Sequence, residues 1–582
     1  MSIRKPQILL AALLAVFVLP LSGCVWWRHP VPPAAPAPQS EAMVAAANPL
    51  AVEAGLEILS AGGSAADAAI ATMAVLGLVE PQSAGLGGGA LLLHYDARDK
   101  DLDAFDGRET APAAATPELF FGEDGKPLPY PQAVASGRSV GAPGLVPALK
   151  LLHEAEGKLP WPRLFEPALR LAEAGFPISR RMHQSIAFMR QRGAFEGEAG
   201  ASARAYLLTP EGAAKPVGEI LRNPAYAETL RAIAAQGPKA LQEGPIAEAI
   251  VASAATAPRP GGLTLADLAA YRAREVEPLC GPYRVYLVCS VPPPGSGGVS
   301  VPELLGLYAR ARPQPEGPAS VEDWAAFIWA SRLAYADRDY YLADTDFSPA
   351  PLAELVAPAY LDARARDIDL AKAAPVRLAP GATSLSGRWG TPPAQPEAGT
   401  THLSVIDPAG NVVSMTATVE APFGAQRMAA GFFLNNQLTD FSLTPTLGGK
   451  PVANAVAPGK RPRSSMSPTI LLEADGDFYA AIGSPGGNSI IAYVAKAIIG
   501  VVDWDLSLQQ AIELPNVVAR GAAIRVERDG FDPAMMERLR ALGWDIQPSA
   551  GENSGLHGFV RTPEGLEGGA DPRREGQARR LD

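Results

Sequence analysis

The sequence predicts an α/β protein in which a strand-rich centre lies between two helical layers, a four-layer sandwich. Three observations favour this fold class. Two helical patterns occupy 48–79, strand patterns dominate after residue 400, and an apolar helix pattern at 490–502 follows the second of two hairpins. The spacing of these elements alone is also compatible with other layered α/β arrangements.

Capping residues predict the first two helices. Asn48 and Pro49 suit the cap and first position of one helix. Ser64 and Asp67 form a capping box that opens a second, alanine-rich helix. A buried strand at 91–95 follows a glycine cluster, which is the reverse of the order in a dinucleotide-binding loop, so no such cofactor is expected.

The segment 143–390 is mostly helical by pattern and is expected to decorate the core. After Thr400 the pattern predicts two hairpins and two helices. The hairpin strands are 401–407 with 412–419 and 469–473 with 478–482, and the helices are 490–502 and 533–542.

Composition and charge exclude several functions. The chain has 582 residues and a formal net charge of -11, which opposes binding to phosphate backbones, so we expect no nucleic-acid partner. Its six histidines are scattered, and no His/Cys/Asp cluster has the spacing of a metal site. We therefore expect no metal and no cofactor.

The N-terminus indicates export. Two basic residues precede an apolar run at 8–19 that is too short to span a bilayer. The Leu-Ser-Gly-Cys that follows resembles a bacterial lipobox, so 1–23 is read as a signal peptide and Cys24 as a lipidated residue; an ordinary cleaved signal is the alternative. Residues 24–39 suit an extended tether, and the expected location is periplasmic, membrane-bound only through the lipid, with the outer membrane favoured.

The other two cysteines, Cys280 and Cys289, flank a turn-like Gly-Pro and an alternating run. In an oxidising compartment they can bridge a hairpin, and two buried free thiols are the alternative.

The candidate nucleophile is Thr400. The chain has no G-x-S-x-G elbow and no plausible Cys/His pair. A polar linker ending at Gly399 leads directly into a strand that opens with two threonines. Cleavage between Gly399 and Thr400 would give Thr400 a free α-amino group with a pKa near 8 beside its own hydroxyl. The alternative is that Thr-Thr is ordinary strand sequence.

From Gly399 onward the sequence resembles the start of the small subunit of γ-glutamyltransferases, and the resemblance covers essentially the whole chain after the tether. The matching stretches are Gly399-Thr400-Thr401-His402-Leu403-Ser404, Phe423-Gly424, Leu434-Asn435-Asn436-Gln437, Asp440-Phe441-Ser442, 460–468, 483–487, 62–69, 108–112 and 292–298.

That resemblance implies the αββα sandwich of N-terminal nucleophile hydrolases, with 40–399 and 400–582 as large and small subunits cut from one precursor and held as a heterodimer. Thr400 would then cleave γ-glutamyl amides of glutathione-like compounds and pass the glutamyl group to water, amino acids or peptides. Thr418 would position the nucleophile, and Gly486 and Gly487 would present N–H groups to the oxyanion.

The resemblance also implies how the substrate's amino-acid head is held. Arg108 would bind its α-carboxylate, assisted by Ser464 and Ser465. Gln437 and Asp440 would hold its α-ammonium.

Two departures from the family bear on specificity. Glu420 stands where many members carry Asn, and Thr439 precedes Asp440 where they carry a second acid. Glu420 either supplies the second negative charge for the ammonium, favouring γ-glutamyl over glutaryl groups, or points away. The stretch 443–453 is shorter than the lid of better-known members and lacks its aromatic residue, which implies a more open site.

Two other functions compete with the leading one. The first is an acylase of the same scaffold, related to glutaryl-cephalosporin acylases. The second is an uncleaved binding protein without catalytic activity.

Overall fold

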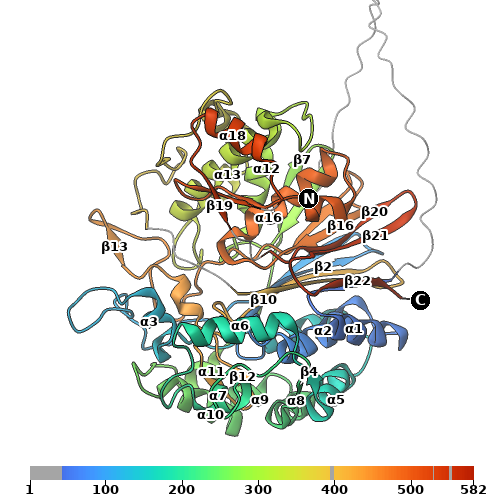
Figure 1. The fold of residues 1–582 in the computed structure, drawn as a ribbon, viewed down its shortest axis with the longest axis vertical. Helices are drawn as coiled ribbons and strands as arrows, with labels where there is room; N and C mark the ends of the chain where they lie inside the picture. The colour runs from blue at the N-terminus through green and yellow to red at the C-terminus, as the bar shows by residue number, and fades with distance from the viewer. Residues whose placement is uncertain (1–41, 393–398, 529, 550–553, 582) are drawn as a thin grey trace, which may run out of the picture. The chain divides into compact units, whose positions relative to one another are not determined.

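The computed structural model describes residues 42–392, 399–528, 530–549 and 554–581. In this part of the chain two β-sheets pack face to face and helices cover both outer faces, so the predicted four-layer αββα sandwich is confirmed (Figure 1). The predicted signal peptide 1–23, the lipidation site Cys24 and the tether 24–39 lie outside the described residues.

The first sheet has seven strands, all antiparallel to their neighbours. Its strands in spatial order are β22 (Gln577–Arg580), β1 (Met43–Ala46), β9 (Thr401–Ile406), β10 (Val412–Thr418), β2 (Gly89–Asp96), β3 (Asp101–Gly107) and β6 (Arg274–Val276). One hydrogen-bonded sheet therefore contains strands from before the Gly399–Thr400 bond (β1, β2, β3 and β6) and from after it (β22, β9 and β10), with β1 between two of the latter. Cutting that bond would leave the two pieces bound to each other through this sheet.

The second sheet has six antiparallel strands. In spatial order these are β21 (Gly565–Ala570), β20 (His557–Thr562), β16 (Phe478–Gly483), β15 (Thr469–Leu472), β8 (Tyr286–Ser290) and β7 (Leu279–Tyr283). A disulfide joins Cys280 on β7 to Cys289 on β8, which decides between the two alternatives for these cysteines. Cys280 and Cys289 also lie directly opposite each other in the register of the two strands.

The two sheets enclose an apolar core. Alternate side chains of β2, among them Leu91, Leu93 and Tyr95, share one buried cluster with Ile470 of β15 and Phe559 of β20. The side chains at the intervening positions of β2 point the other way and face the first helical layer. Strand periodicity thus assigns each residue of β2 to one of two interfaces.

The first helical layer contains α1 (Pro49–Ser60) and α2 (Ala65–Val79). Both predicted caps are present: Asn48 accepts from the backbone of Leu50, and Ser64 and Asp67 form the capping box. Every residue of α2 is buried, since its alanines allow close approach to the sheet and to neighbouring helices. α4 (Leu145–Glu156) packs on β2 and β3 in the same layer.

The opposite layer consists of α12 (Gly297–Ala311), α13 (Val321–Tyr341) and α16 (Ile490–Val502), the last as predicted. The expectation that 143–390 only decorates the core is wrong for this part: β7, β8, α12 and α13 belong to the sandwich itself. Helical periodicity reveals an apolar face but not the surface that it covers.

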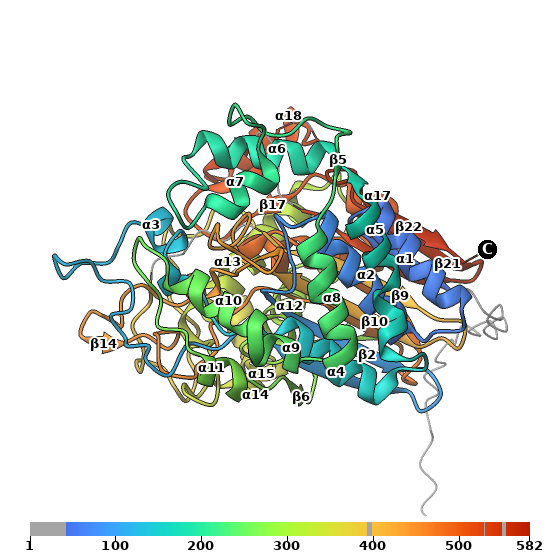
Figure 2. The same cartoon turned by 90° about the horizontal axis from the view of Figure 1, so that it is seen from below.

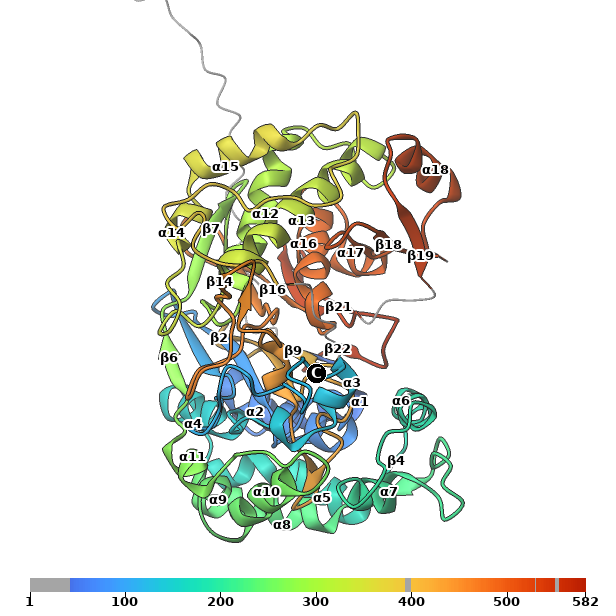
Figure 3. The same ribbon diagram turned by 90° about the vertical axis from the view of Figure 1, so that its left-hand side faces the viewer.

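Another group of helices, on the far side of α1 and α2 from the sheet, does match the expectation that 143–390 decorates the core. It includes α5 (Glu166–Ala174), α8 (Pro224–Gln236) and α10 (Gly244–Ala255), and Figures 2 and 3 show it beneath the first helical layer. The predicted hairpins β9–β10 and β15–β16 and the helix α18 (Pro533–Ala541) are also present. Within the described ranges no helix is long and apolar enough to cross a bilayer.

Candidate active site

A small pocket opens where β9 begins and β10 and β3 end, and it brings together nearly all the predicted site residues. Its space measures about 230 Å³, including the part open to solvent. The lining residues are Arg108, Thr400, Thr418, Glu420, Gln437, Asp440, Ser464, Ser465, Met466, Gly487 and Ile490. Of the predicted residues, Gly486 is absent from this lining and directly precedes Gly487, and Gly399 directly precedes Thr400.

Two threonine hydroxyls meet at the ends of the central hairpin. Thr400 precedes β9, and Thr418 is the last residue of β10. The Thr400 Oγ1 donates to Thr418 Oγ1 at 3.0 Å, and Thr418 Oγ1 also accepts from the Glu420 backbone N–H at 2.9 Å. The Thr400 hydroxyl is therefore held in one orientation by the neighbouring strand.

The backbone around Thr400 is constrained. Its φ is 88°, a left-handed conformation that is strained for a β-branched residue. The Thr400 N–H donates to the Ser83 carbonyl at 3.0 Å, and Arg574 Nη1 donates to the Thr400 carbonyl at 3.1 Å. A Cβ at Gly399 would lie 1.7 Å from the Glu420 carbonyl oxygen, so only glycine fits there. Strain and tight packing thus coincide at the predicted scissile bond.

Arg108 follows β3 and its side chain is fully buried. Nε donates to the Pro462 carbonyl at 3.0 Å, and Nη2 donates to the Arg463 carbonyl at 2.9 Å and pairs with Asp440. Nη1 has no hydrogen-bond partner among the described residues. One arm of the guanidinium fork is therefore left for a ligand.

Gln437 and Asp440 begin and end one 3₁₀ turn. Gln437 Nε2 donates to Asp440 Oδ2 at 2.7 Å, the oxygen that also pairs with Arg108. Gln437 Oε1 and Asp440 Oδ1 are buried and accept no hydrogen bond from the described part of the chain. Buried polar atoms normally find partners, so these two acceptors beside the free arm of Arg108 call for a ligand that has both an ammonium and a carboxylate.

Glu420 lines the pocket, and both oxygens of its carboxylate are engaged by neighbouring side chains. Its Oε1 accepts from the Tyr130 hydroxyl at 3.0 Å, and its Oε2 accepts from Asn436 Nδ2. Tyr130 is the first residue of α3 (Tyr130–Val134). Burial, followed by the charges of Glu420 and Asp440, raises the pKa of Tyr130 well above its ordinary value, so this hydroxyl stays a donor.

The remaining predicted residues lie on the other wall. Ser464 Oγ accepts from the Met466 N–H at 3.1 Å, and Ser465 Oγ is held by Arg338 and by Asn488. Gly486 and Gly487 have φ values of 128° and 57° and lead through a short 3₁₀ turn into α16. Glycine is required for that turn, which brings backbone rather than side chain toward Thr400.

Sequence reasoning missed Tyr130, Asn436, Arg574 and Glu109. Tyr130 and Arg574 are distant in sequence from every motif, and no local pattern marks them. Glu109 follows Arg108 directly; its Oε2 lies 3.8 Å from Arg108 Nη1, and neither of its oxygens has a hydrogen-bond partner among the described residues. Burial raises the pKa of Glu109 to about 8, against which the charge of Arg108 acts as the main opposing influence.

Comparisons with known proteins identify the family to which this fold and sequence are similar. A family model described as gamma-glutamyltranspeptidase matches residues 51–581. The chain is 34% identical over 512 residues to the glutathione hydrolase proenzyme of Bacillus subtilis strain 168, covering 86% of this chain and 85% of that protein. It is 34% identical over 551 residues to the glutathione hydrolase proenzyme of Escherichia coli strain K12, covering 92% and 91%.

The solved structures that are similar to this chain include both an acylase and a transpeptidase. The cephalosporin acylase from Bacillus halodurans superposes with a TM-score of 0.81 at 28% identity, covering 95% of this chain and 98% of that one. The gamma-glutamyltranspeptidase of Helicobacter pylori superposes with a TM-score of 0.55 at 30% identity, covering 58% and 95%.

Proposed function

Because the chain belongs to the gamma-glutamyltranspeptidase family, we propose that it is a self-processing enzyme that transfers the γ-glutamyl group of glutathione-like compounds to water, amino acids or peptides. The observation that carries this proposal is the set of three unused polar atoms in one pocket: Arg108 Nη1, Gln437 Oε1 and Asp440 Oδ1. One cationic donor beside two acceptors is complementary to the carboxylate and ammonium of an α-amino acid.

Maturation begins, in this proposal, at the strained bond before Thr400. The Thr400 hydroxyl attacks the Gly399 carbonyl carbon, the C–N bond breaks, and the glycyl group passes to Oγ1 as an ester. Breaking the C–N bond frees the α-amino group of Thr400; water then hydrolyses the ester, which releases the Gly399 carboxylate and restores the Thr400 hydroxyl. A left-handed β-branched residue stores about 1–3 kcal/mol, which the cleavage would release.

In turnover, the new amine of Thr400 accepts the proton of its own hydroxyl as Oγ1 attacks the γ-carbonyl of the substrate. The hydroxyl of Thr418 supports the orientation of Oγ1. N–H groups of Gly486 and Gly487 stabilise the oxyanion, and the protonated amine gives its proton to the departing nitrogen. Water or an acceptor amine then attacks the glutamyl ester on Thr400.

In this proposal Glu420 strengthens the preference for an acyl group that carries an α-amino group over one that lacks it. Glu420 and Asp440 both line the pocket, so in this proposal two negative charges lie near the place of the α-ammonium. A glutaryl group lacks that ammonium and would leave both carboxylates facing a neutral methylene chain. Selection against glutaryl groups follows from this loss.

A second candidate is an acylase acting on glutaryl or cephalosporin-type amides, the alternative favoured by the structural likeness to the cephalosporin acylase. Both candidates use the same nucleophile. They differ in whether the acyl group must carry a charged nitrogen.

A substrate comparison separates the two candidates. We expect γ-glutamyl p-nitroanilide to be cleaved at least about 100-fold faster in kcat/KM than glutaryl p-nitroanilide, since losing a buried charge-assisted contact costs about 3 kcal/mol. Asp440→Asn should remove most of that preference. A wild-type enzyme that prefers the glutaryl compound would replace this proposal with the acylase.

The export route stays part of the proposal. We propose a signal peptide at 1–23, lipidation at Cys24, a periplasmic location with the outer membrane favoured, and subunits 40–399 and 400–582. The Cys280–Cys289 disulfide is consistent with an oxidising compartment. We expect Cys24→Ala to leave the membrane fraction and to keep its activity. If Cys24→Ala still fractionates with the membrane, Cys24 is not the lipidated residue.

A further inference from the structure

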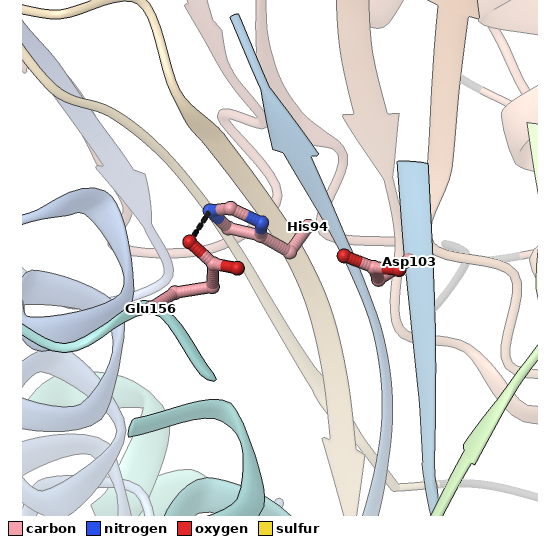
Figure 4. Close-up of side chains that lie close together, drawn as sticks. All are labelled: His94, Asp103 and Glu156. Atoms are coloured by element: carbon pink, nitrogen blue, oxygen red, sulfur yellow. Dashed lines mark ion pairs between the residues drawn. The ribbon is translucent and has the colours of Figure 1, made fainter. Parts of the chain in front are cut away.

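Three potential metal ligands meet far from the pocket, at the other end of the same strands. The ligand atoms of His94, Asp103 and Glu156 all lie within 4.8 Å of one another. Figure 4 shows the imidazole of His94 between the two carboxylates. The residues are distant in sequence, so the spacing argument against a metal could not have detected them.

Three elements fix this arrangement. His94 on β2 and Asp103 on β3 are direct partners in the antiparallel register, so their side chains leave the sheet on the same face. Glu156 is the last residue of α4, which packs on that face. The Ser64 hydroxyl donates to the Glu156 carbonyl at 2.8 Å and holds the helix end in place.

The hydrogen bonds of the protein do not satisfy His94. Its side chain is 1% exposed, and Nδ1 has no hydrogen-bond partner among the described residues. Nε2 lies 3.8 Å from Glu156 Oε2, which is too long for a hydrogen bond. The buried Nδ1 therefore has unused hydrogen-bonding capacity, and Nε2 faces the Glu156 carboxylate without reaching hydrogen-bond distance.

The surroundings of His94 are negative. Further carboxylates, among them Asp96 and Glu275, lie near enough to Asp103 and Glu156 to repel their negative charge. The nearby cation Arg98 has a side chain that is 82% exposed and donates to Asp99 instead. A bound cation would relieve the repulsion that these carboxylates share.

We propose that His94, Asp103 and Glu156 bind one divalent transition-metal ion, with Zn²⁺ as the probe. One imidazole and two carboxylates form a mixed nitrogen and oxygen ligand set, which suits Zn²⁺ better than Mg²⁺, a metal that prefers oxygen alone. The ion would connect the C-terminal end of α4 to β2 and β3. Its role is structural, since His94 lies five residues along β2 from Gly89, about 17 Å from the Thr418 end.

The test uses the full chain without a polyhistidine tag, treated with a chelator and then dialysed. Calorimetric titration with ZnCl₂ should give one site per chain, and metal analysis after desalting should give one zinc. Glu156→Gln and Asp103→Asn keep side-chain shape and remove one ligand charge, so each should weaken zinc binding at least about 10-fold. Glu154→Gln, two residues away on the exposed face of α4, is the matched control and should bind as wild type does.

Thermal unfolding provides a second readout. At one fixed zinc concentration, zinc should raise the melting temperature of wild type and Glu154→Gln, and should raise that of Glu156→Gln or Asp103→Asn by clearly less. Mg²⁺ at the same concentration should not compete with Zn²⁺. Absence of stoichiometric zinc in wild type, equal affinity in Glu156→Gln and Glu154→Gln, or full competition by Mg²⁺ would overturn the proposal.

Discussion

The two ends of β2 and β3 carry polar clusters of opposite character. At the end near Gly89, the pocket combines a buried guanidinium, Arg108, with the acceptors of Gln437 and Asp440. At the other end, His94 lies between the carboxylates of Asp103 and Glu156. Both clusters have unused hydrogen-bonding capacity, but only the first offers both signs of charge.

This difference indicates what each end can bind. Unused donors and acceptors together match a zwitterion, and unused acceptors with a neutral imidazole match a metal cation. The backbone differs as well, since left-handed φ values at Thr400 and Glu420 lie beside the pocket, while β2 and β3 pair in regular register at the other end. A left-handed conformation is therefore present directly at the bond where cleavage is proposed.

Removing the cation from the pocket should have the largest kinetic effect. In Arg108→Gln the substrate carboxylate loses its charged partner, and kcat/KM for γ-glutamyl p-nitroanilide should fall by about 100-fold or more. A substrate whose α-carboxylate is converted to an amide serves as the control. Wild type should process it as poorly as the variant processes the normal substrate; if the amide is a good wild-type substrate, Arg108 does not bind the carboxylate.

Removing the hydroxyl that holds Thr400 should have a smaller effect. Thr418→Val keeps the shape of the side chain and deletes the 3.0 Å contact to Thr400 Oγ1. Both self-cleavage and turnover should slow by about 10-fold, the cost of one hydrogen bond. Ser414→Ala, an inward strand position on β10 away from the pocket, provides a control that should cleave normally. Normal cleavage in Thr418→Val would remove Thr418 from the mechanism.

Removing a hydrogen bond that holds the Glu420 side chain should change the selectivity between substrates more than the turnover rate. Tyr130→Phe removes the 3.0 Å hydrogen bond to Glu420 and leaves the aromatic ring. The ratio of γ-glutamyl to glutaryl cleavage should fall by about 3-fold, while kcat for the γ-glutamyl compound stays close to wild type. Glu420→Gln should lower the same ratio further. If the ratio is unchanged in both variants, Glu420 does not contribute to recognition of the substrate's α-ammonium group.

The smallest effect concerns pH. The pKa of Glu109 is raised to about 8, so its carboxyl is neutral below that pH and ionises above it. The new charge, 3.8 Å from Arg108 Nη1, would compete with the substrate carboxylate. KM should therefore rise in wild type as the pH passes 8, and Glu109→Gln should keep a flatter KM to pH 9.5. Parallel profiles would exclude Glu109 from this role.

Local sequence patterns were sufficient for most elements of the fold. The capping box of Ser64 and Asp67, the hairpin around Gly410 and the helix after Gly487 depend on neighbouring residues, and each is present. The layers formed by β7, β8, α12 and α13 were misjudged because the surface that a helix or strand covers depends on residues far away in the chain.

The candidate site was predictable only where residues belong to a family motif. Arg108 and Asp440 were named from the resemblance, Thr400 was named from the linker before its strand and then from the resemblance, and the structure gathers all three at one pocket. Tyr130 reaches Glu420 across 290 positions of sequence, and no periodicity or spacing encodes that contact. The cluster of His94, Asp103 and Glu156 was missed for the same reason.

The most direct test of the proposed mechanism is the intact mass of wild type and Thr400→Ala, measured beside γ-glutamyl p-nitroanilide hydrolysis. Wild type should give two fragments that begin and end at the Gly399–Thr400 bond, together with activity, and Thr400→Ala should give one inactive, uncut chain. An active wild-type preparation consisting of a single uncut chain, or cleavage of Thr400→Ala at the same bond, would contradict the account. An uncut and inactive wild type would favour the non-catalytic binding protein.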